Sequence, residues 1–310
     1  MNLSEMIDLG QIREIVSGKI LLNEPLAKYT TFKIGGPADI YVEPMNINEL
    51  LNLLRYLDDR EIDFVVLGNG SNVLISDDGF RGAVINLEAG FNFVKEESGC
   101  VVAGAGIKLA RFVDFCVENG LRGVEMLAGI PGTLGGAIIM NAGAYSGEIS
   151  DYLLDVEVIR NMKLVRLKKE ECGFGYRTSN LTNDIVIQAR FKFPPGDVEE
   201  MKKIRREILL KRNKSQPVDF PNAGSIFKNP PGDYAGRLIE KAGLKGICIG
   251  DAQISERHAN FIINKGNAKA IDVLELIKLA QTKVYEKFGI KLELEVRLIG
   301  FKESEIVELL

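Results

Sequence analysis

Glycine density in residues 128–147 constrains this chain more than any other feature of its sequence. Six of the nineteen positions at 129–147 are glycine, and Pro131 interrupts the same run. Glycine at such density is typical of backbone that adopts positive φ or approaches a ligand that a Cβ atom would exclude. The apolar residues 137–140 inside the run favour burial over a flexible linker. The segment is therefore predicted to be a packed loop that wraps a ligand.

A second glycine loop lies earlier in the chain. Residues 64–67 and 73–75 are predicted to be short strands, and residues 68–72 between them read Gly-Asn-Gly-Ser-Asn. These residue types turn the chain sharply and direct N–H and hydroxyl donors into one concavity, the kind of nest that binds phosphate. Two such loops predict a ligand that contains a diphosphate.

Composition limits the class of protein. The chain has 310 residues, 46% of them hydrophobic and 26% charged, which is enough for two or three folded domains. The formal net charge of -4, without a basic stripe interleaved with aromatic residues, gives no reason to expect a nucleic-acid partner. No apolar run approaches the ~18 residues that cross a bilayer, and the N-terminal residues contain no signal-peptide core. We therefore expect a cytoplasmic protein with no membrane partner.

The four cysteines are Cys100, Cys116, Cys172 and Cys248, and the one histidine is His258. The cysteines are widely spaced and form no CxxC pair, so neither a disulfide framework nor a zinc site is expected. We predict reduced structural thiols and no metal. A lone histidine is more often structural than catalytic, and the spacing of His258 assigns it no role.

Hydrophobic periodicity predicts a mixed α+β fold. Helices are predicted at residues 3–17, after an N-cap at Asn48, at 109–119, from Asp197 onward, and in a segment that ends at Gly289. Further strands are predicted at 31–34, 40–42, 84–87, 101–103, 156–160, 163–167, 185–193 and 291–298. The expected connections are a hairpin turn at 35–37, a charged turn at 95–99 and a hairpin about Asn161 and Met162.

Residues 101–106 imitate the start of a Rossmann dinucleotide-binding unit, because a strand meets a GxG pattern before a helix. The third glycine of that fingerprint would fall at Leu109, whose side chain prevents the close approach of helix and strand. No P-loop pattern is present either. The better interpretation is an ordinary strand-to-helix turn.

The sequence Pro-Pro-Gly at 194–196 predicts a domain boundary. The helix that follows carries Met201, Ile204 and Ile208 on one face and a basic set on the other. The basic residues are Lys202, Lys203, Arg205, Arg206, Lys211 and Arg212. They are interpreted as a solvated face, with steering of an anionic substrate as the alternative.

Seven segments, in this order, resemble the UDP-N-acetylenolpyruvoylglucosamine reductase family, whose other name is UDP-N-acetylmuramate dehydrogenase. They are TTFKIGGPAD, GNGSNVLI, AGIPGTLGGAIIMNAGAY, GYRTSN, AGSIFKNP, ISERHANFIIN and LELEVRLIG, and they span nearly the whole chain. The chain is similar to the shorter, type II form, which lacks the tyrosine loop that closes over the substrate in the longer form. No residue is therefore assigned to that closing role.

The resemblance implies a two-lobed α+β FAD-binding domain of the vanillyl-alcohol-oxidase (PCMH) type and a smaller α+β substrate-binding domain. The implied ranges are a helical lead-in at 1–19, the FAD domain at 20–196 with lobes at about 20–93 and 94–196, and the substrate domain at 197–310. The last strand, at 291–299, contributes to the active site in this scheme.

The implied activity is NADPH-dependent reduction of UDP-N-acetylglucosamine enolpyruvate to UDP-N-acetylmuramate through non-covalent FAD. This oxidoreductase step belongs to bacterial peptidoglycan synthesis, and thereby to cell wall biogenesis, cell shape, the cell cycle and cell division. A monomeric flavoprotein is expected.

The resemblance also implies site residues. Arg177, Ser225 and Glu295 match the catalytic positions, and Asn229 joins them in binding substrate. Arg297 is expected at the flavin or the base of the site, and Tyr145 in a ligand site or, equally, in the core or on the surface. The residues expected to bind FAD are Gly68, Asn69, Gly70, Ser71, Asn72, Ile130, Pro131, Gly132, Gly135, Gly136, Ala137 and Asn141.

From the residues alone, each catalytic position has another interpretation. Arg177 could be a surface arginine, Ser225 a turn residue, and Glu295 a water-facing residue of an alternating strand. Two other functions also stay open: an FAD oxidase of the same fold that acts on another substrate, and a nucleotide-sugar-binding protein without redox activity.

Overall fold

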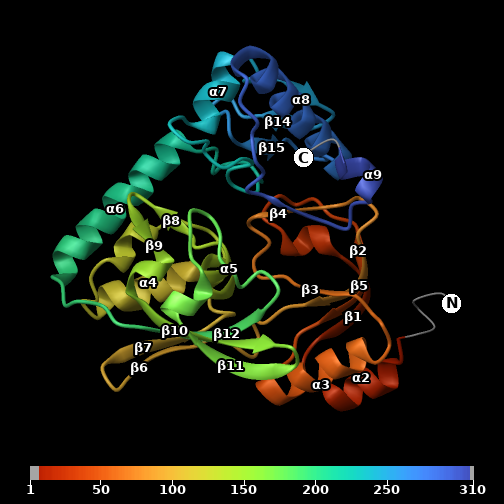
Figure 1. Cartoon of the computed structure of the whole chain (residues 1–310), viewed down its shortest axis with the longest axis vertical. Coiled ribbons are helices and arrows are strands. Elements are labelled where there is room, and N and C mark those ends of the chain that lie inside the picture. The colour runs from red at the N-terminus through yellow and green to blue at the C-terminus, as the bar shows by residue number, and fades with distance from the viewer. Residues whose placement is uncertain (1–6, 308–310) are drawn as a thin grey trace. The chain divides into compact units, whose positions relative to one another are not determined.

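The computed structural model describes residues 7–307, which form two compact units (Figure 1). Unit 1 contains the described residues up to Leu22, together with Ile40–Asn69 and Gly82–Arg212. Unit 2 contains Asn23–Asp39, Gly70–Arg81 and the described residues from Asn213 onward. Each unit combines segments that are far apart in sequence. The ranges predicted for the FAD-binding and substrate-binding domains differ from these two units and stay predictions.

The five-stranded sheet of unit 1 is antiparallel throughout, with strand order β11-β10-β12-β7-β6. Its strands are β6 (Val94–Glu97), β7 (Cys100–Gly104), β10 (Leu153–Arg160), β11 (Lys163–Lys168) and β12 (Ile185–Phe191). The predicted hairpin about Asn161 and Met162 is confirmed, because Arg160 pairs with Lys163. The two turn residues between them, Asn161 and Met162, have positive φ of 49° and 57°. That conformation is the one that matches the twist of paired strands.

The predicted turn at 95–99 is too long. β6 occupies most of it, and Ser98 and Gly99 alone reverse the chain, with φ of 53° and 72°. The charges that suggested a turn lie on an edge strand, where exposed charged side chains are common because they discourage pairing with another chain.

Helices cover the apolar faces of unit 1. They are α2 (Leu9–Ile15), α3 (Ile47–Asp58), α4 (Leu109–Glu118), α5 (Leu134–Ile139) and, extending to Ser215, α6 (Val198–Ser215), with the 3-10 turns η2 (Val124–Leu127), η3 (Ile149–Tyr152) and η4 (Lys169–Cys172). The helices predicted at 109–119 and from Asp197 are confirmed. Of the predicted lead-in at 3–17, the structure shows α2, and the residues before Ile7 lie outside the described part.

The N-cap predicted at Asn48 is wrong. Asn46 caps α3, because its Oδ1 accepts a hydrogen bond of 3.0 Å from the backbone N–H of Glu49. The Glu49 carboxylate in turn accepts the N–H of Met45 at 2.8 Å. Asn48 already lies in the first turn, so an asparagine two residues earlier had the better geometry for the orphan donors of the helix.

A four-stranded sheet has the order β1-β2-β5-β3, formed by β1 (Ile20–Pro25), β2 (Pro37–Val42), β3 (Phe64–Val66) and β5 (Phe80–Ile85). The strand predicted at 31–34, and with it the hairpin to 40–42, is wrong. Lys33 has φ of 58°, which breaks an extended chain, and Phe32 and Ile34 are buried in the core of unit 2. Burial produced the alternating pattern without strand pairing.

Unit 2 is built around α8 (Ala270–Phe288), whose predicted end at Gly289 is confirmed by a φ of 68° there. Its apolar face packs with α7 (Ala235–Lys241) and a three-stranded sheet, as Figure 1 shows. The remaining elements are η1 (Leu26–Tyr29), β4 (Val73–Ile75), β13 (Cys248–Ile249), β14 (Ala252–Ile254), β15 (Ile262–Asn264), β16 (Arg297–Ile299) and α9 (Glu303–Ile306). β4 and β16 pair in parallel, with Val73 opposite Arg297.

The strand predicted at 291–298 is mostly wrong as regular structure, since only β16 is formed. The alternation is real, because Leu292 and Val296 are both 3% exposed in the core of unit 2. Instead, its backbone forms hydrogen bonds, outside a regular strand, with the residues that follow Ser225.

The glycine-rich segment is not a loop throughout. Residues 134–139 form α5, whose N-cap is Thr133, and the hairpin of β8 (Gly143–Ala144) and β9 (Gly147–Glu148) follows. Its predicted burial is confirmed at Ala137 and Ile138, which are 6% and 0% exposed. The glycines masked a short helix because glycine has low helix propensity.

Candidate active site

Unit 1 contains a small recess between the two glycine loops. It has a volume of about 70 Å³, and its lining includes Gly68, Gly106, Thr133, Gly135 and Gly136. Residues 184–186, at the start of β12, also line it. Because ligand pockets usually have volumes of about 300–1,000 Å³, this recess is large enough for only part of an FAD molecule.

The glycines of the recess are of two kinds. A Cβ atom on Gly68 would lie 2.4 Å from Thr133 Oγ1, and one on Gly135 would lie 2.9 Å from the Cβ of Ala105. A Cβ atom at either position would be too close to Thr133 or Ala105, so these two glycines allow close packing there. A Cβ atom on Gly136 would meet Thr133 Oγ1 at 3.6 Å, an ordinary contact, so this glycine keeps space open toward the recess.

The residues predicted to bind FAD are distributed over both units. Gly68, Gly135 and Gly136 line the recess, and Gly132 lies beside it, with its carbonyl oxygen 2.9 Å from the N–H of Leu109. The unit 1 set also contains Asn69, Ile130, Pro131, Ala137 and Asn141, whereas Gly70, Ser71 and Asn72 belong to unit 2.

Asn141 is fully buried and has φ of 43°. Its Nδ2 donates to Glu148 Oε2 at 2.8 Å and to the carbonyl oxygen of Gly175 at 3.0 Å. Among residues 7–307, its Oδ1 is a buried side-chain oxygen without a hydrogen-bond partner. An unpaired buried acceptor costs about 1–3 kcal/mol, so the two donated bonds must offset a real penalty.

Arg177 lies two residues beyond Gly175, at the corner of a tight turn. Gly175 and Thr178 close this turn with reciprocal backbone hydrogen bonds of 3.1 and 3.3 Å, and Arg177 has φ of 55°. The Arg177 Nη2 donates to the carbonyl oxygen of Gly143 at 2.5 Å. The arginine is half-buried and its guanidinium carbon is 5.1 Å from the ring centre of Tyr176, so it is not an ordinary surface arginine.

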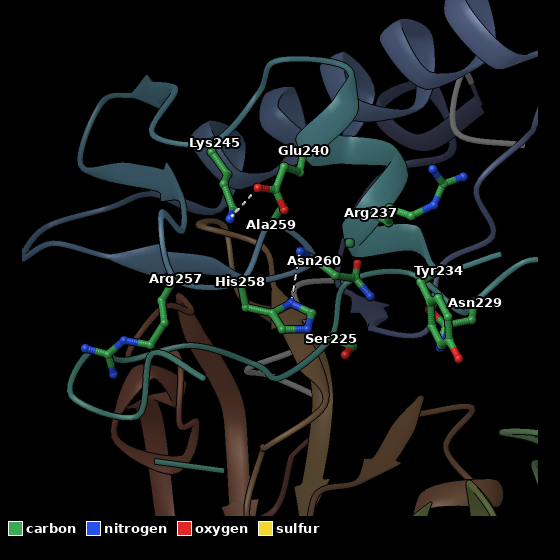
Figure 2. A pocket seen from close by; sticks show the side chains of 11 residues that line it. Ser225, Asn229, Tyr234, Arg237, Glu240, Lys245, Arg257, His258, Ala259 and Asn260 are labelled. Atoms are coloured by element: carbon green, nitrogen blue, oxygen red, sulfur yellow. Dashed lines mark hydrogen bonds and ion pairs between the residues drawn. The ribbon is translucent and has the colours of Figure 1, made fainter. Parts of the chain in front are cut away.

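Unit 2 contains a larger cavity, with a volume of about 340 Å³ (Figure 2). Hydrogen-bond donors and cations line it, and a size of this order suits a small-molecule ligand. The lining residues are Ser225, Asn229, Tyr234, Gly236, Arg237, Glu240, Lys245, Arg257, His258, Ala259 and Asn260.

Hydrogen bonds bring four predicted site residues of unit 2 together: Asn72, Ser225, Glu295 and Arg297. The N–H of Glu295 donates to the carbonyl oxygen of Ile226 at 2.8 Å, directly after Ser225. Asn72 Nδ2 donates to the carbonyl oxygen of Glu295 at 3.0 Å, and the Asn72 carbonyl accepts the N–H of Arg297 at 3.0 Å. Residues from three distant parts of the chain therefore meet beside Ser225.

Asn260 holds the same segment from the other side, and sequence reasoning did not identify it. Its Oδ1 accepts the N–H of Phe227 at 3.0 Å, and its Nδ2 donates to the Phe227 carbonyl at 2.7 Å. Its own carbonyl accepts the N–H of Ile226 at 2.9 Å. The ISERHANFIIN segment was a signal for this residue, but an asparagine there has no recognisable spacing to Ser225.

His258 lines the cavity and is held in one orientation. Its Nδ1 accepts the N–H of Asn260 at 3.3 Å, and its ring packs edge-on to Phe261 with 4.9 Å between ring centres. Burial, and secondarily the charge of Lys245, lower the pKa of His258. A neutral imidazole whose Nδ1 accepts a hydrogen bond carries its proton on Nε2. Figure 2 shows the ring and the Ser225 side chain facing the same part of the cavity.

The cations of the cavity are each paired with a carboxylate. Arg237 pairs with Asp233, Lys245 with Glu240 at 3.0 Å, and Arg257 with Asp219 at 2.7 Å. The Arg237 hydrogen bond lowers the pKa of Asp233 to about 2. These pairs leave the cavity with positive groups that are fixed in place, and none of the three was predicted from sequence.

The remaining sequence candidates are partly exposed and partly at the cavity wall. Tyr145 is 45% exposed at the tip of the β8–β9 hairpin with φ of 51°, and the side chain of Arg297 is exposed on β16. Asn229 Oδ1 accepts the N–H of Ala235 at 3.1 Å, so its amide group is oriented at the cavity wall. The four cysteines are free thiols.

Neither a metal centre nor a membrane segment is found within residues 7–307. No group of three or more His, Cys, Asp or Glu side chains in this range is arranged to hold a metal ion. None of its helices combines the length and apolar character that a bilayer crossing requires.

Comparison with known proteins extends this picture. A family model described as "FAD binding domain" matches residues 38–163, and one described as "UDP-N-acetylenolpyruvoylglucosamine reductase, C-terminal domain" matches residues 216–299. The chain is 46% identical over 298 residues to the UDP-N-acetylenolpyruvoylglucosamine reductase of Caldanaerobacter subterraneus subsp. tengcongensis, covering 95% of this chain and 98% of the relative. It is 45% identical over 307 residues to the enzyme of that name from Chloroherpeton thalassium, covering 96% and 99%.

A solved structure agrees with the sequence relatives. The crystal structure of UDP-N-acetylenolpyruvylglucosamine reductase from Thermus caldophilus superposes with a TM-score of 0.78 at 41% identity, covering 91% of this chain and 98% of that one. The α+β fold, the FAD-binding match and relatives along nearly the whole length agree. The chain belongs to the UDP-N-acetylenolpyruvoylglucosamine reductase family.

Proposed function

We propose that this chain reduces UDP-N-acetylglucosamine enolpyruvate to UDP-N-acetylmuramate, with NADPH as the source of hydride and FAD as its carrier. Beyond family membership, the observation that carries the proposal is the donor-lined cavity beside Ser225. A UDP-sugar is rich in acceptor oxygens and carries a diphosphate, and the cavity offers the fixed donors of Asn229, His258 and Arg257. The family assignment favours this reductase over an oxidase or a non-redox sugar-binding protein.

The residues of unit 1 fit an FAD site. Gly136 leaves open space at the recess, and Gly68 and Gly135 allow Thr133 and Ala105 to pack closely against the chain. Backbone N–H groups of such segments suit the diphosphate of the cofactor. When bound, FAD supplies the hydride that adds to the CH₂ carbon of the enolpyruvyl group.

Arg177 is proposed to stabilise the charge that this addition creates. Hydride addition at the CH₂ carbon places negative charge on the adjacent carbon and in the carboxylate attached to it. A guanidinium can meet a carboxylate with two parallel hydrogen bonds, which adds orientation to charge stabilisation.

Ser225 is proposed to deliver the proton. Its hydroxyl hydrogen goes to the carbon beside the carboxylate, which completes a lactyl ether from the enolpyruvyl group. A serine is a weak acid in water, but it suffices against a strongly basic carbanion if it is held in place. The Ile226 and Phe227 bonds to Asn260 provide that hold.

Glu295 and Asn229 complete the proposed set. The backbone N–H of Glu295 bonds to the carbonyl oxygen of Ile226, the residue after Ser225. From there the Glu295 carboxylate is proposed to relay a proton to the serine or to polarise the developing enolate. The amide of Asn229 is proposed to bind the diphosphate of the UDP group.

Spectroscopy of the two half-reactions tests the proposal. Purified protein should show flavin absorption that bleaches on anaerobic addition of NADPH and returns on addition of UDP-N-acetylglucosamine enolpyruvate. Bleaching without return would contradict the assigned substrate, and a protein that neither contains nor takes up FAD would contradict the assignment as a whole. Equal bleaching rates with NADH would contradict the choice of NADPH.

We also propose that the enzyme is a monomer in the cytoplasm, where both nucleotide substrates are dissolved. It is proposed to bind neither nucleic acid nor a membrane. Sedimentation of the FAD-loaded protein at micromolar concentration tests the oligomeric state.

A further inference from the structure

Asn141 and Arg177 are joined by a pair of hydrogen bonds that run in opposite directions between two segments. Asn141 donates to the carbonyl oxygen of Gly175 at 3.0 Å, two residues before Arg177. Arg177 donates to the carbonyl oxygen of Gly143 at 2.5 Å, two residues after Asn141. Both the backbone and the head group of the arginine are therefore fixed relative to residues 141–143.

The turn that carries Arg177 transmits this restraint. Gly175 and Thr178 bond to each other in both directions, at 3.1 and 3.3 Å, so the four-residue turn is closed on itself. Fixing the Gly175 carbonyl consequently fixes the Arg177 Cα. Arg177 also has φ of 55°, a conformation that a non-glycine residue keeps only if its surroundings enforce it.

The side chain of Asn141 is committed to this task. One amide hydrogen is directed to Gly175 and the other to Glu148 Oε2 at 2.8 Å, and within the described residues its Oδ1 accepts none. Its φ of 43° lies in the left-handed region, which asparagine tolerates better than most residues. The residue thus suits a buried double donor on a left-handed backbone.

We propose that Asn141, expected from sequence to bind FAD, is the positioning residue of Arg177, and that it sets how tightly the enzyme holds the carboxylate of the enolpyruvyl group. This inference rests on the proposed function, because it needs Arg177 to meet that carboxylate. Asn141 acts through the Gly175 carbonyl and does not touch the substrate.

Two ligands that differ by the enolpyruvyl group, which carries the carboxylate, separate this role from general stability. Oxidised, FAD-loaded enzyme is titrated without NADPH with UDP-N-acetylglucosamine enolpyruvate and, separately, with UDP-N-acetylglucosamine. No turnover occurs without NADPH. The dissociation constant of UDP-N-acetylglucosamine divided by that of UDP-N-acetylglucosamine enolpyruvate therefore reports the contacts of the enolpyruvyl group, including the contact to its carboxylate. The wild-type enzyme should bind the enolpyruvyl compound more tightly, and Arg177→Ala should abolish most of that preference.

Asn141→Gly keeps a backbone that tolerates positive φ and removes both donors. It should weaken binding of the enolpyruvyl compound by about ten- to hundredfold, the range expected for losing a hydrogen bond to a charged group, and leave UDP-N-acetylglucosamine binding within about twofold. Adding Arg177→Ala to Asn141→Gly should weaken binding little further, because both changes remove the same contact.

Two more variants keep the test decisive. Asn141→Asp preserves shape but sets a carboxylate against Glu148 and the Gly175 carbonyl, and it should lower the same ratio; it keeps the proposal testable if Asn141→Gly does not fold. Ser179→Ala is the matched control, because Ser179 Oγ donates to the Ile139 carbonyl at 2.7 Å, linking the same two segments away from Arg177. It should leave the ratio unchanged.

The outcomes are distinct. A wild-type enzyme that binds both ligands equally would overturn the proposed function. A wild-type preference that persists in folded, FAD-loaded Asn141 variants, or an equal loss for both ligands, would overturn the positioning role.

Discussion

The backbone nitrogen of Glu295 lies 2.8 Å from the carbonyl oxygen of Ile226 and donates a hydrogen bond to it. Ile226 directly follows Ser225, so Glu295, which is proposed to assist Ser225, is bonded to its neighbour in the chain. The bond is made by main-chain atoms. The side chains of Ser225 and Glu295 can therefore be changed without removing the connection that brings them together, which makes both positions suitable for mutation.

Ser225→Ala should separate the two half-reactions. Reduction by NADPH needs no proton from Ser225 and should keep its wild-type rate, whereas reoxidation by the enolpyruvyl sugar should slow by about 10²–10⁴-fold, the usual contribution of a general acid. Anaerobic stopped-flow absorbance of the flavin measures both rates. An equal loss in the two half-reactions would argue against a proton donor.

Glu295→Gln should reduce turnover while the melting temperature stays close to wild type. The backbone bonds to Ile226 and Asn72 are kept, and only the charge and basicity of the side chain are lost. Steady-state rates per FAD and thermal unfolding are the measurements. A lower melting temperature with normal activity per folded molecule would return Glu295 to a structural role.

Arg177→Lys should lower reoxidation by about 10²–10³-fold, comparable to removal of one oxyanion-stabilising donor. Lysine keeps the positive charge but loses the planar fork of donors. FAD content, measured from the absorption spectrum, serves as the control and should be unchanged. Near-native turnover in this variant would contradict the carboxylate assignment.

Gly135→Ala and Gly136→Ala form a matched pair within α5. The first places a Cβ atom 2.9 Å from the Ala105 Cβ, so it should destabilise the fold, by about 1–3 kcal/mol as overpacking usually does. The second makes an ordinary contact at 3.6 Å and, as an alanine in a helix, should be neutral or slightly stabilising.

Denaturant unfolding of the FAD-free proteins compares these two stabilities, and FAD titration follows. If Gly136 keeps space open for the cofactor, Gly136→Ala should weaken FAD binding without destabilising the chain. Unchanged FAD affinity would show that the recess at Gly136 is not used.

His258 should make stability depend on pH below neutrality. Burial and Lys245 lower its folded pKa, so between that value and about 6.5 the unfolded chain binds more protons than the folded one. The contribution is fully present above about pH 6.5 and is lost as the pH falls toward the folded pKa. His258→Gln should remove this part of the slope below about pH 6.5.

Because the chain has one histidine, a single imidazole proton signal in an NMR titration reports the pKa of His258 directly. A midpoint at or above the ordinary value, or an unchanged pH slope in His258→Gln, would contradict the prediction. The free energy of unfolding at each pH gives the slope.

The sequence predicted elements well where one local rule was sufficient. The hairpin at Asn161 and Met162, the helix that ends at Gly289 and the helix predicted at 109–119 all follow from neighbouring residues. The interpretation failed where burial mimicked strand periodicity, as at Phe32 and Ile34, since alternation reports which side chains are buried and not whether the backbone is paired.

The site shows the same limit. The family resemblance selected Ser225 and Glu295, but only the structure shows that Asn260 holds Ile226 and Phe227, the two residues after Ser225. Contacts such as Asn72 with Glu295 join positions whose spacing in the sequence follows no rule. The roles proposed for Arg177, Ser225 and Glu295 are predictions that the variants above test, and the diphosphate contact of Asn229 is a prediction as well.

The parallel pairing of β4 with β16 sets an order of events during synthesis. Val73 leaves the ribosome early, yet its partner Arg297 is among the last described residues to be translated. Phe32, Ile34 and Leu74, all buried in the finished core of unit 2, must wait in the nascent chain until α8 arrives to cover them. Until then these apolar side chains stay exposed to other chains, so the unfinished unit 2 is the stage most open to aggregation.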